Sequence, residues 1–117
     1  MATIYALNNT YTDIKYAGTT DLTKGDDLEI GGSLCFALVD YDASEDDSVT
    51  VVVACSKVQA PKIAATAFTA GDVVYWDATN DEITDASTGN TEVGVCVEDA
   101  ALADTVIYIT WQGYNFA

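Results

Sequence analysis

Turn signals divide this chain about every ten residues, and the segments between them are rich in β-branched and aromatic residues. The pairs Gly31-Gly32, Asn80-Asp81 and Gly89-Asn90 are typical of turns, because Gly and Asn adopt positive φ at low cost. This spacing favours many short antiparallel strands over helices. We therefore predict an all-β fold, a compact antiparallel β-barrel or β-sandwich of short strands, with at most one short helical turn.

The predicted strands are short apolar runs bounded by these turns. They are Thr3–Leu7, Asp13–Tyr16, Asp27–Ile30, Leu34–Val39, Ser48–Ala54, Lys57–Pro61, Asp72–Trp76, Glu82–Thr84, Glu92–Glu98 and Thr105–Trp111. In the last of them the alternation of side chains places Ile107, Ile109 and Trp111 on one face. The run Val51-Val52-Val53 is apolar on both faces, which indicates a doubly buried central strand. Only Ile63–Phe68 could form a helical turn, with a loop as the alternative.

A chain of 117 residues is expected to form one domain with a core of its own. We divide it into an N-terminal arm or strand at residues 1–20 and a β-barrel or β-sandwich domain at residues 21–117 with an aromatic C-terminal tail. No basic segment followed by an apolar one opens the chain, and no apolar run approaches the length that spans a membrane. We therefore expect a soluble chain without an export signal.

The charge of the chain excludes two classes of partner. It carries 19 acidic residues against four lysines, with no arginine and no histidine. Nucleic acids and anionic membranes are held chiefly by Lys and Arg on phosphates, so we predict neither as a partner. Two interpretations of the acidity stay open, an ordinary acidic surface and adaptation to a salty environment, where screening weakens self-repulsion.

The three cysteines, Cys35, Cys55 and Cys96, each lie inside an apolar run. Their odd number and spacing favour buried free thiols in a reducing compartment. Neither a Cys-x-x-Cys pair nor a histidine accompanies them, so a zinc site has little support.

Catalytic chemistry has no clear candidate. Without histidine, nucleophiles activated by a histidine base are excluded. Carboxylate pairs carry little information in a chain with so many acids, and no phosphate-binding glycine motif is present. We predict no enzyme activity, no catalytic residue and no cofactor.

One segment, Asp40–Asp47, has the alternating oxygen ligands that open a calcium-binding loop. Glu45 stands where such a loop needs glycine, and Val51 stands where it needs a bidentate glutamate. We therefore predict a solvated loop and no metal site. A weak calcium site remains the alternative, with the candidate ligands Asp40, Asp42, Asp46 and Asp47.

Aromatic residues gather near both ends of the chain. Large aromatics are frequent anchors of protein interfaces. The interface candidates are Tyr5, Tyr11, Tyr16, Trp111, Tyr114 and Phe116. The alternatives are packing within the same subunit and a platform for binding sugars.

The segment Ala70–Asp77 reads Ala-Gly-Asp-Val-Val-Tyr-Trp-Asp. It resembles the "aGD.VYwd" signature of a family of small bacteriophage proteins described as capsid decoration (cement) or capsid fibre proteins. Four further segments resemble elements of that family in the same order. They are Asp26–Ala37, Lys57–Lys62, Asn90–Val97 and Ala100–Ile109, so that the resemblance covers roughly residues 20–111.

The resemblance implies a non-enzymatic virion structural protein, assembled in the host bacterial cytoplasm. Such a protein would sit as a homotrimer on the outer capsid surface and bridge neighbouring major capsid proteins. We expect residues 1–16 and the aromatic tail to be contact regions. The alternatives are another virion component, such as a fibre base or a head–tail piece, and a calcium- or carbohydrate-binding β-module.

Overall fold

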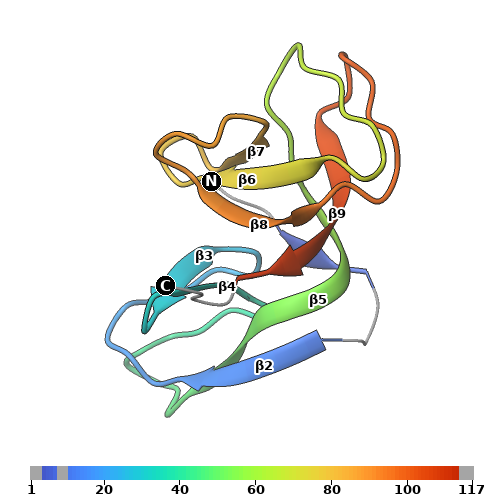
Figure 1. Ribbon diagram of the computed structural model, residues 1–117. Helices are drawn as coiled ribbons and strands as arrows, with labels where there is room; N and C mark the ends of the chain where they lie inside the picture. Colours follow the sequence, from blue (N-terminus) through green and yellow to red (C-terminus); the bar gives the residue numbers. More distant parts are fainter. Residues whose placement is uncertain (1–3, 8–10, 114–117) are drawn as a thin grey trace.

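The computed structural model describes residues 4–7 and 11–113 and shows an all-β fold (Figure 1). The strands are β1 (Tyr5–Ala6), β2 (Tyr11–Tyr16), β3 (Asp27–Ile30), β4 (Ser33–Ala37), β5 (Val49–Pro61), β6 (Val73–Asp77), β7 (Glu82–Thr84), β8 (Thr91–Val95) and β9 (Val106–Gln112). All paired strands are antiparallel, which confirms the predicted fold class. In this part of the chain no helix is long and apolar enough to cross a membrane.

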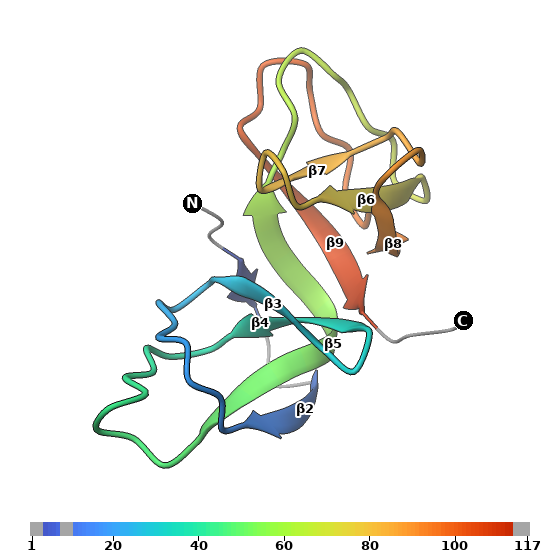
Figure 2. The same cartoon turned by 90° about the vertical axis from the view of Figure 1, so that its left-hand side faces the viewer.

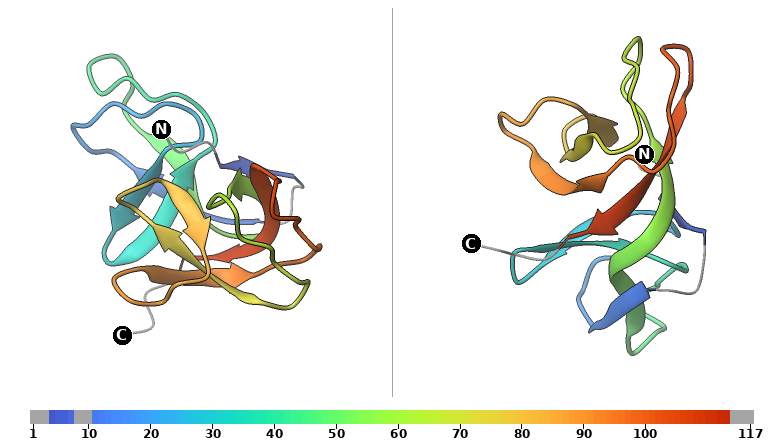
Figure 3. Two further views of the ribbon diagram at one scale, coloured as in Figure 1. Left: turned by 90° about the horizontal axis from the view of Figure 1, so that it is seen from above. Right: turned by 45° about the vertical axis from the view of Figure 1, so that its right-hand side comes forward.

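Strand β5 organises the larger, six-stranded sheet. Its first half pairs with β2 on one edge and with β4 on the other, and its second half pairs with β1 and β9 in the same way. Figure 3 shows β5 curving through the whole molecule. The prediction of two separate strands, Ser48–Ala54 and Lys57–Pro61, was wrong. The polar pair Ser56-Lys57 does not end the strand, because a shift of register against β9 between Cys55 and Val58 accommodates it.

A second sheet, in the order β7-β6-β8, lies against the first (Figure 2). The two sheets join where Cys96 bridges to Ile109 of β9, and the Val97 N–H donates to the Tyr108 carbonyl oxygen at 2.9 Å. The segment that follows β8 thus pairs with β9, and this connection gives the fold its barrel-like curl.

Between the sheets the core centres on three aromatic rings. The rings of Trp76 on β6 and Trp111 on β9 meet edge to face, with centroids 5.9 Å apart. Phe36 on β4 packs on Trp111 in the same manner at 5.4 Å. Edge-to-face pairs of this kind stabilise a fold by about 0.5–1.5 kcal/mol beyond their buried area. The predicted faces of β6 and β9 are confirmed, since Val74, Trp76, Ile107, Ile109 and Trp111 are buried.

A second, smaller apolar cluster covers the opposite face of β5. Val51 and Val53 belong to it, whereas Val52 between them faces the main core. All three side chains are at most 3% exposed, which confirms the predicted doubly buried strand. The three cysteines are buried and free, as predicted.

The turns of the sequence signature form as predicted. Gly71 has a φ of +98°, and the Asp72 carboxylate accepts the Thr69 N–H at 2.9 Å. Asp81 has a φ of +54°, and its turn is held by N–H donors that reach the carboxylate of Asp77. The segment Ile63–Phe68 forms a loop and no helical turn, so the loop alternative is the correct one.

Candidate interaction surfaces

The acidic loop, residues 40–47, uses its carboxylates to hold its own backbone. Asp42 accepts the Ser44 N–H at 2.9 Å and the Ser44 hydroxyl at 2.7 Å, and these bonds lower the pKa of Asp42. Asp46 accepts the Asp42 N–H at 3.0 Å, and Asp40 accepts the Lys24 N–H at 2.8 Å. Such side-chain to backbone bonds are typical of ordered polar loops.

The four carboxylates named as a weak calcium site do not form a ligand set. Within residues 4–7 and 11–113, no group of three or more His, Cys, Asp or Glu side chains is placed to hold a metal ion. Calcium requires six to eight oxygen ligands at one point. Asp40, Asp42 and Asp46 each accept a backbone N–H group, and the weak calcium site stays a prediction.

Trp111 is fully buried in its own subunit, which corrects its assignment as an interface candidate. Its indole N–H donates to the Leu34 carbonyl oxygen at 3.2 Å, and its ring contacts Phe36 and Trp76. The alternative of packing within the same subunit therefore applies to it. Strict alternation along β9 was the available signal, since it groups Trp111 with Ile107 and Ile109.

The remaining aromatic candidates divide into three groups. Tyr16 is half-buried, and its ring packs edge to face on Tyr41 at 5.5 Å. Tyr5 and Tyr11 lie on β1 and β2, along one edge of β5. Tyr114 and Phe116 lie outside the described residues. Their role as contacts stays a prediction.

The described part of the predicted N-terminal arm, residues 1–20, is built into the sheet. Ile4 is 1% exposed, and its N–H donates to the Gly25 carbonyl oxygen at 3.1 Å. Strands β1 and β2 both pair with β5. The strand alternative therefore describes these residues.

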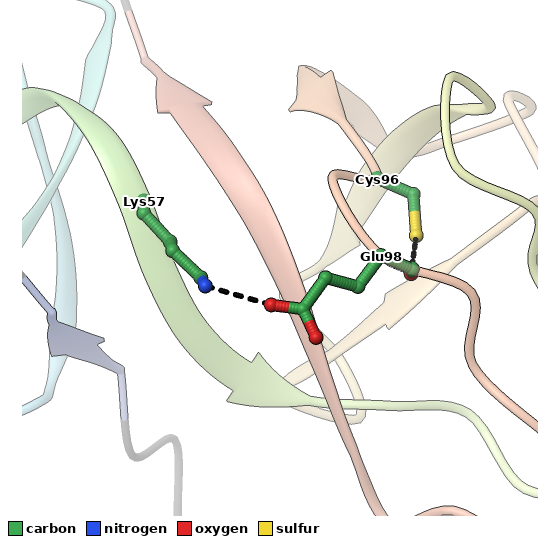
Figure 4. A network of polar contacts seen from close by, with 3 residues as sticks. All are labelled: Lys57, Cys96 and Glu98. Atoms are coloured by element: carbon green, nitrogen blue, oxygen red, sulfur yellow. Dashed lines mark hydrogen bonds and ion pairs between the residues drawn. The ribbon is translucent and has the colours of Figure 1, made fainter.

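An exposed ion pair lies on the outer face where β5 and β9 meet the segment after β8 (Figure 4). The Lys57 ammonium is 2.7 Å from the Glu98 carboxylate and lies 5.5 Å from the centre of the Tyr108 ring. The Cys96 thiol donates to the Glu98 carbonyl oxygen, and burial raises the pKa of Cys96. A solvent-exposed pair of this kind adds less than about 1 kcal/mol. The raised pKa disfavours the thiolate, which is the reactive form of Cys96.

Two loops lie side by side at one end of the molecule (Figures 1 and 3). We call residues 62–70 and 99–105 the loop tip. Phe68 and Ala100 join the loops by two backbone hydrogen bonds of 2.9 Å. A pocket of about 370 Å³ opens here, lined by Lys62, alanines at 64 and 65, and residues 102–105.

This pocket was not predicted from the sequence, although one signal was available. No acidic residue occurs between Asp47 and Asp72, in a chain that carries 19 of them. The Lys62 side chain is buried in spite of its charge. Its ammonium donates to the carbonyl oxygens of Ile63 and Asp104, at 3.0 and 3.3 Å.

A comparison with protein families matches residues 8–111 to the family described as phage cement protein. This chain belongs to the phage cement protein family. The match runs from just before β2 through most of β9 and so includes part of the predicted N-terminal segment. No curated protein and no solved structure matches this cement protein. Membership implies a decoration role on a phage capsid.

In this cement protein the signature segment Ala70–Asp77 is structural. Val74 and Trp76 of the segment are buried in the main core, and the Asp77 carboxylate holds the turn that follows. The Trp76 indole N–H also donates to the Asp27 carboxylate of β3 at 3.0 Å, which ties the second sheet to the first. The signature segment thus contributes to the packing between the two sheets. Contacts with other proteins are expected on other surfaces of the molecule.

Proposed function

We propose that this cement protein binds the outer surface of a phage capsid as a homotrimer and stabilises contacts between neighbouring major capsid proteins. The observation that carries the proposal is the family match over residues 8–111. The proposed action is binding without catalysis. The absence of histidine from the chain supports this part of the proposal.

The charge of the protein supports an outer location. With a formal net charge of −15, the chain is repelled by packaged nucleic acid inside a capsid. On the outside, the same charge keeps a particle soluble and reduces its adhesion to other anionic surfaces.

The fold supports a role as a clamp. Strand β5 runs through both apolar clusters, so the two halves of the molecule are held by one continuous strand. A rigid body loses little conformational freedom when it binds, and many copies on one shell multiply a modest affinity per site. We further propose assembly in the reducing cytoplasm of the bacterial host, which the three free buried thiols support.

Light scattering on the purified chain tests the trimer. We expect a mass close to three times 12.4 kDa, or threefold clusters once the protein is bound to capsids. A chain that stays monomeric and does not bind capsids prepared without it contradicts the proposal. Electron microscopy that finds the protein only at the tail would instead select another virion component.

A further inference from the structure

The loop tip differs from the rest of the surface in its chemistry. Its exposed residues are mostly apolar, with alanines at positions 64, 65, 101 and 103 around Leu102. Leu102 is 60% exposed, the highest value among the exposed large apolar side chains of the described residues. Exposed apolar groups gathered around a pocket are typical of binding sites.

The carboxylates of the loop tip accept hydrogen bonds from its own backbone N–H groups. The Asp99 carboxylate accepts the Ala70 N–H at 2.8 Å, and the Asp104 carboxylate accepts the Ala101 N–H at 2.9 Å. Together with the Phe68–Ala100 pairing, these bonds fix the two loops in one arrangement. The pocket is therefore formed before any partner arrives, which lowers the entropic cost of binding.

Lys62 places a buried ammonium at the pocket, and no carboxylate of the described residues forms an ion pair with it. Asp104, which also lines the pocket, accepts the Ala101 N–H with its carboxylate. The Lys62 side chain is 5% exposed, and the only ion pair found among the described residues is that of Lys57 with Glu98. Its two hydrogen-bond acceptors are backbone carbonyls, and the Phe68 ring lies 5.8 Å away. An ammonium has three N–H donors, and a buried cation is stabilised by an opposite charge. The pocket is therefore complementary to a group that carries a carboxylate.

We propose that the loop-tip pocket is the docking site for the capsid shell protein, and that it takes an apolar side chain with a neighbouring Asp or Glu carboxylate. The apolar group contacts Leu102 and the alanines, and the carboxylate pairs with the Lys62 ammonium. This inference rests on the proposed capsid-binding function and adds the surface that performs it. It also orients the molecule, with the loop tip toward the shell and the acidic loop at the opposite end facing outward (Figure 1).

The test measures binding of purified variants to capsids prepared without the cement protein. Leu102→Asp places a charge on the pocket rim at a largely exposed position, so the fold is retained. Val39→Asp is the matched control, because Val39 is 54% exposed and lies beside the acidic loop. We expect Leu102→Asp to weaken binding per site by about tenfold or more, and Val39→Asp to leave it within about twofold.

A second variant tests the carboxylate. Lys62→Met keeps the apolar stem and removes the charge, and circular dichroism measures whether the variant folds. We expect a loss of about tenfold or more in affinity, as for one partner removed from a buried charge pair. A folded Lys62→Met variant that binds like the unchanged protein overturns the assignment of a carboxylate-bearing partner. If Lys62→Met does not fold, the binding of Leu102→Asp decides whether the loop tip is the docking site.

The outcomes separate this inference from the proposed function. If the unchanged protein binds and Leu102→Asp binds equally well, the loop tip is not the docking site, although the function stands. If Leu102→Asp alters the mass in solution and leaves capsid binding intact, the pocket joins two copies of the chain, and the inference is wrong. If the unchanged protein does not bind capsids at all, both the function and the inference fall.

Discussion

At the scale of single residues, burial decides what the titratable groups can do. The thiol of Cys35 is fully buried in the second apolar cluster, and this burial raises the pKa of Cys35 to about 11. Asp27 is half-buried beside the Trp76 indole, and burial raises its pKa in spite of that hydrogen bond. Both groups lie in packed structure and not in a cleft, so their shifts reflect packing and not a catalytic site.

The first prediction concerns the thiols. An alkylating reagent reacts with the thiolate, so at pH 8 and in the native state we expect no label on Cys35. In denaturant all three cysteines should react. Mass spectrometry counts the labels, and rapid native labelling of Cys35 would show that the second cluster is not closed.

The second prediction concerns Asp27. Because its pKa is raised from 3.8 in the folded chain, the folded state keeps the proton to a higher pH than the unfolded state does. Folding stability therefore falls as the pH rises from about 4 through the raised pKa. Asp27→Asn keeps an oxygen that can accept the Trp76 N–H and removes the buried charge.

We expect Asp27→Asn to unfold at higher denaturant than the unchanged protein at pH 7, with a gain below about 1 kcal/mol because the group is half exposed. The gain should vanish below pH 3.8. Glu29→Gln, at an exposed position on the same strand, controls for the loss of one negative charge. An equal gain in the control would show that general charge repulsion, and not burial of Asp27, causes the effect.

At the scale of elements, close backbone packing fixes how the strands meet. Gly113 follows β9 and lies between β4 and β5. Its N–H donates to the Val53 carbonyl oxygen at 2.8 Å, and its carbonyl accepts the Leu34 N–H at 2.6 Å. A Cβ at this position would collide with the Leu34 carbonyl oxygen. Only glycine lets the end of β9 enter this space between the two strands.

The third prediction follows from this contact. Gly113→Ala must separate β4 from β9, which should destabilise the fold by roughly 1–3 kcal/mol. Gln112→Ala, one residue earlier at an exposed position, is the control and should change stability by less than about 0.5 kcal/mol. Urea unfolding measures both. A Gly113→Ala variant as stable as the control would show that the space is wider than described.

The elements also show how far the sequence alone could lead. Local patterns predicted the strands, the two turns around the signature segment and the buried face of β9, because each depends on neighbours along the chain. They failed at Ser56-Lys57, where the pairing with β9 carries β5 past a polar pair that suggested a break. The loop-tip pocket was not predicted, since it joins residues near 65 to residues near 102. The acid-free stretch between Asp47 and Asp72 marks the first loop but does not show which distant segment packs beside it.

At the scale of the whole molecule, the protein is 42 Å long, with different chemistry at its two ends. The acidic loop lies at one end and the apolar loop tip at the other. Charge repulsion favours an arrangement in which the acidic end faces solvent. Burial of the apolar loop tip against a partner lowers the free energy through the hydrophobic effect. A decoration protein with these ends is expected to stand on the shell in one orientation.

The central claim is that this cement protein decorates the outside of a capsid, and electron cryomicroscopy of the virion tests it most directly. We expect density for this all-β fold on the outer shell, in threefold clusters between neighbouring major capsid proteins, with the loop tip toward the shell. Density confined to the tail, or no density on the outer shell of particles that contain the protein, would contradict this account.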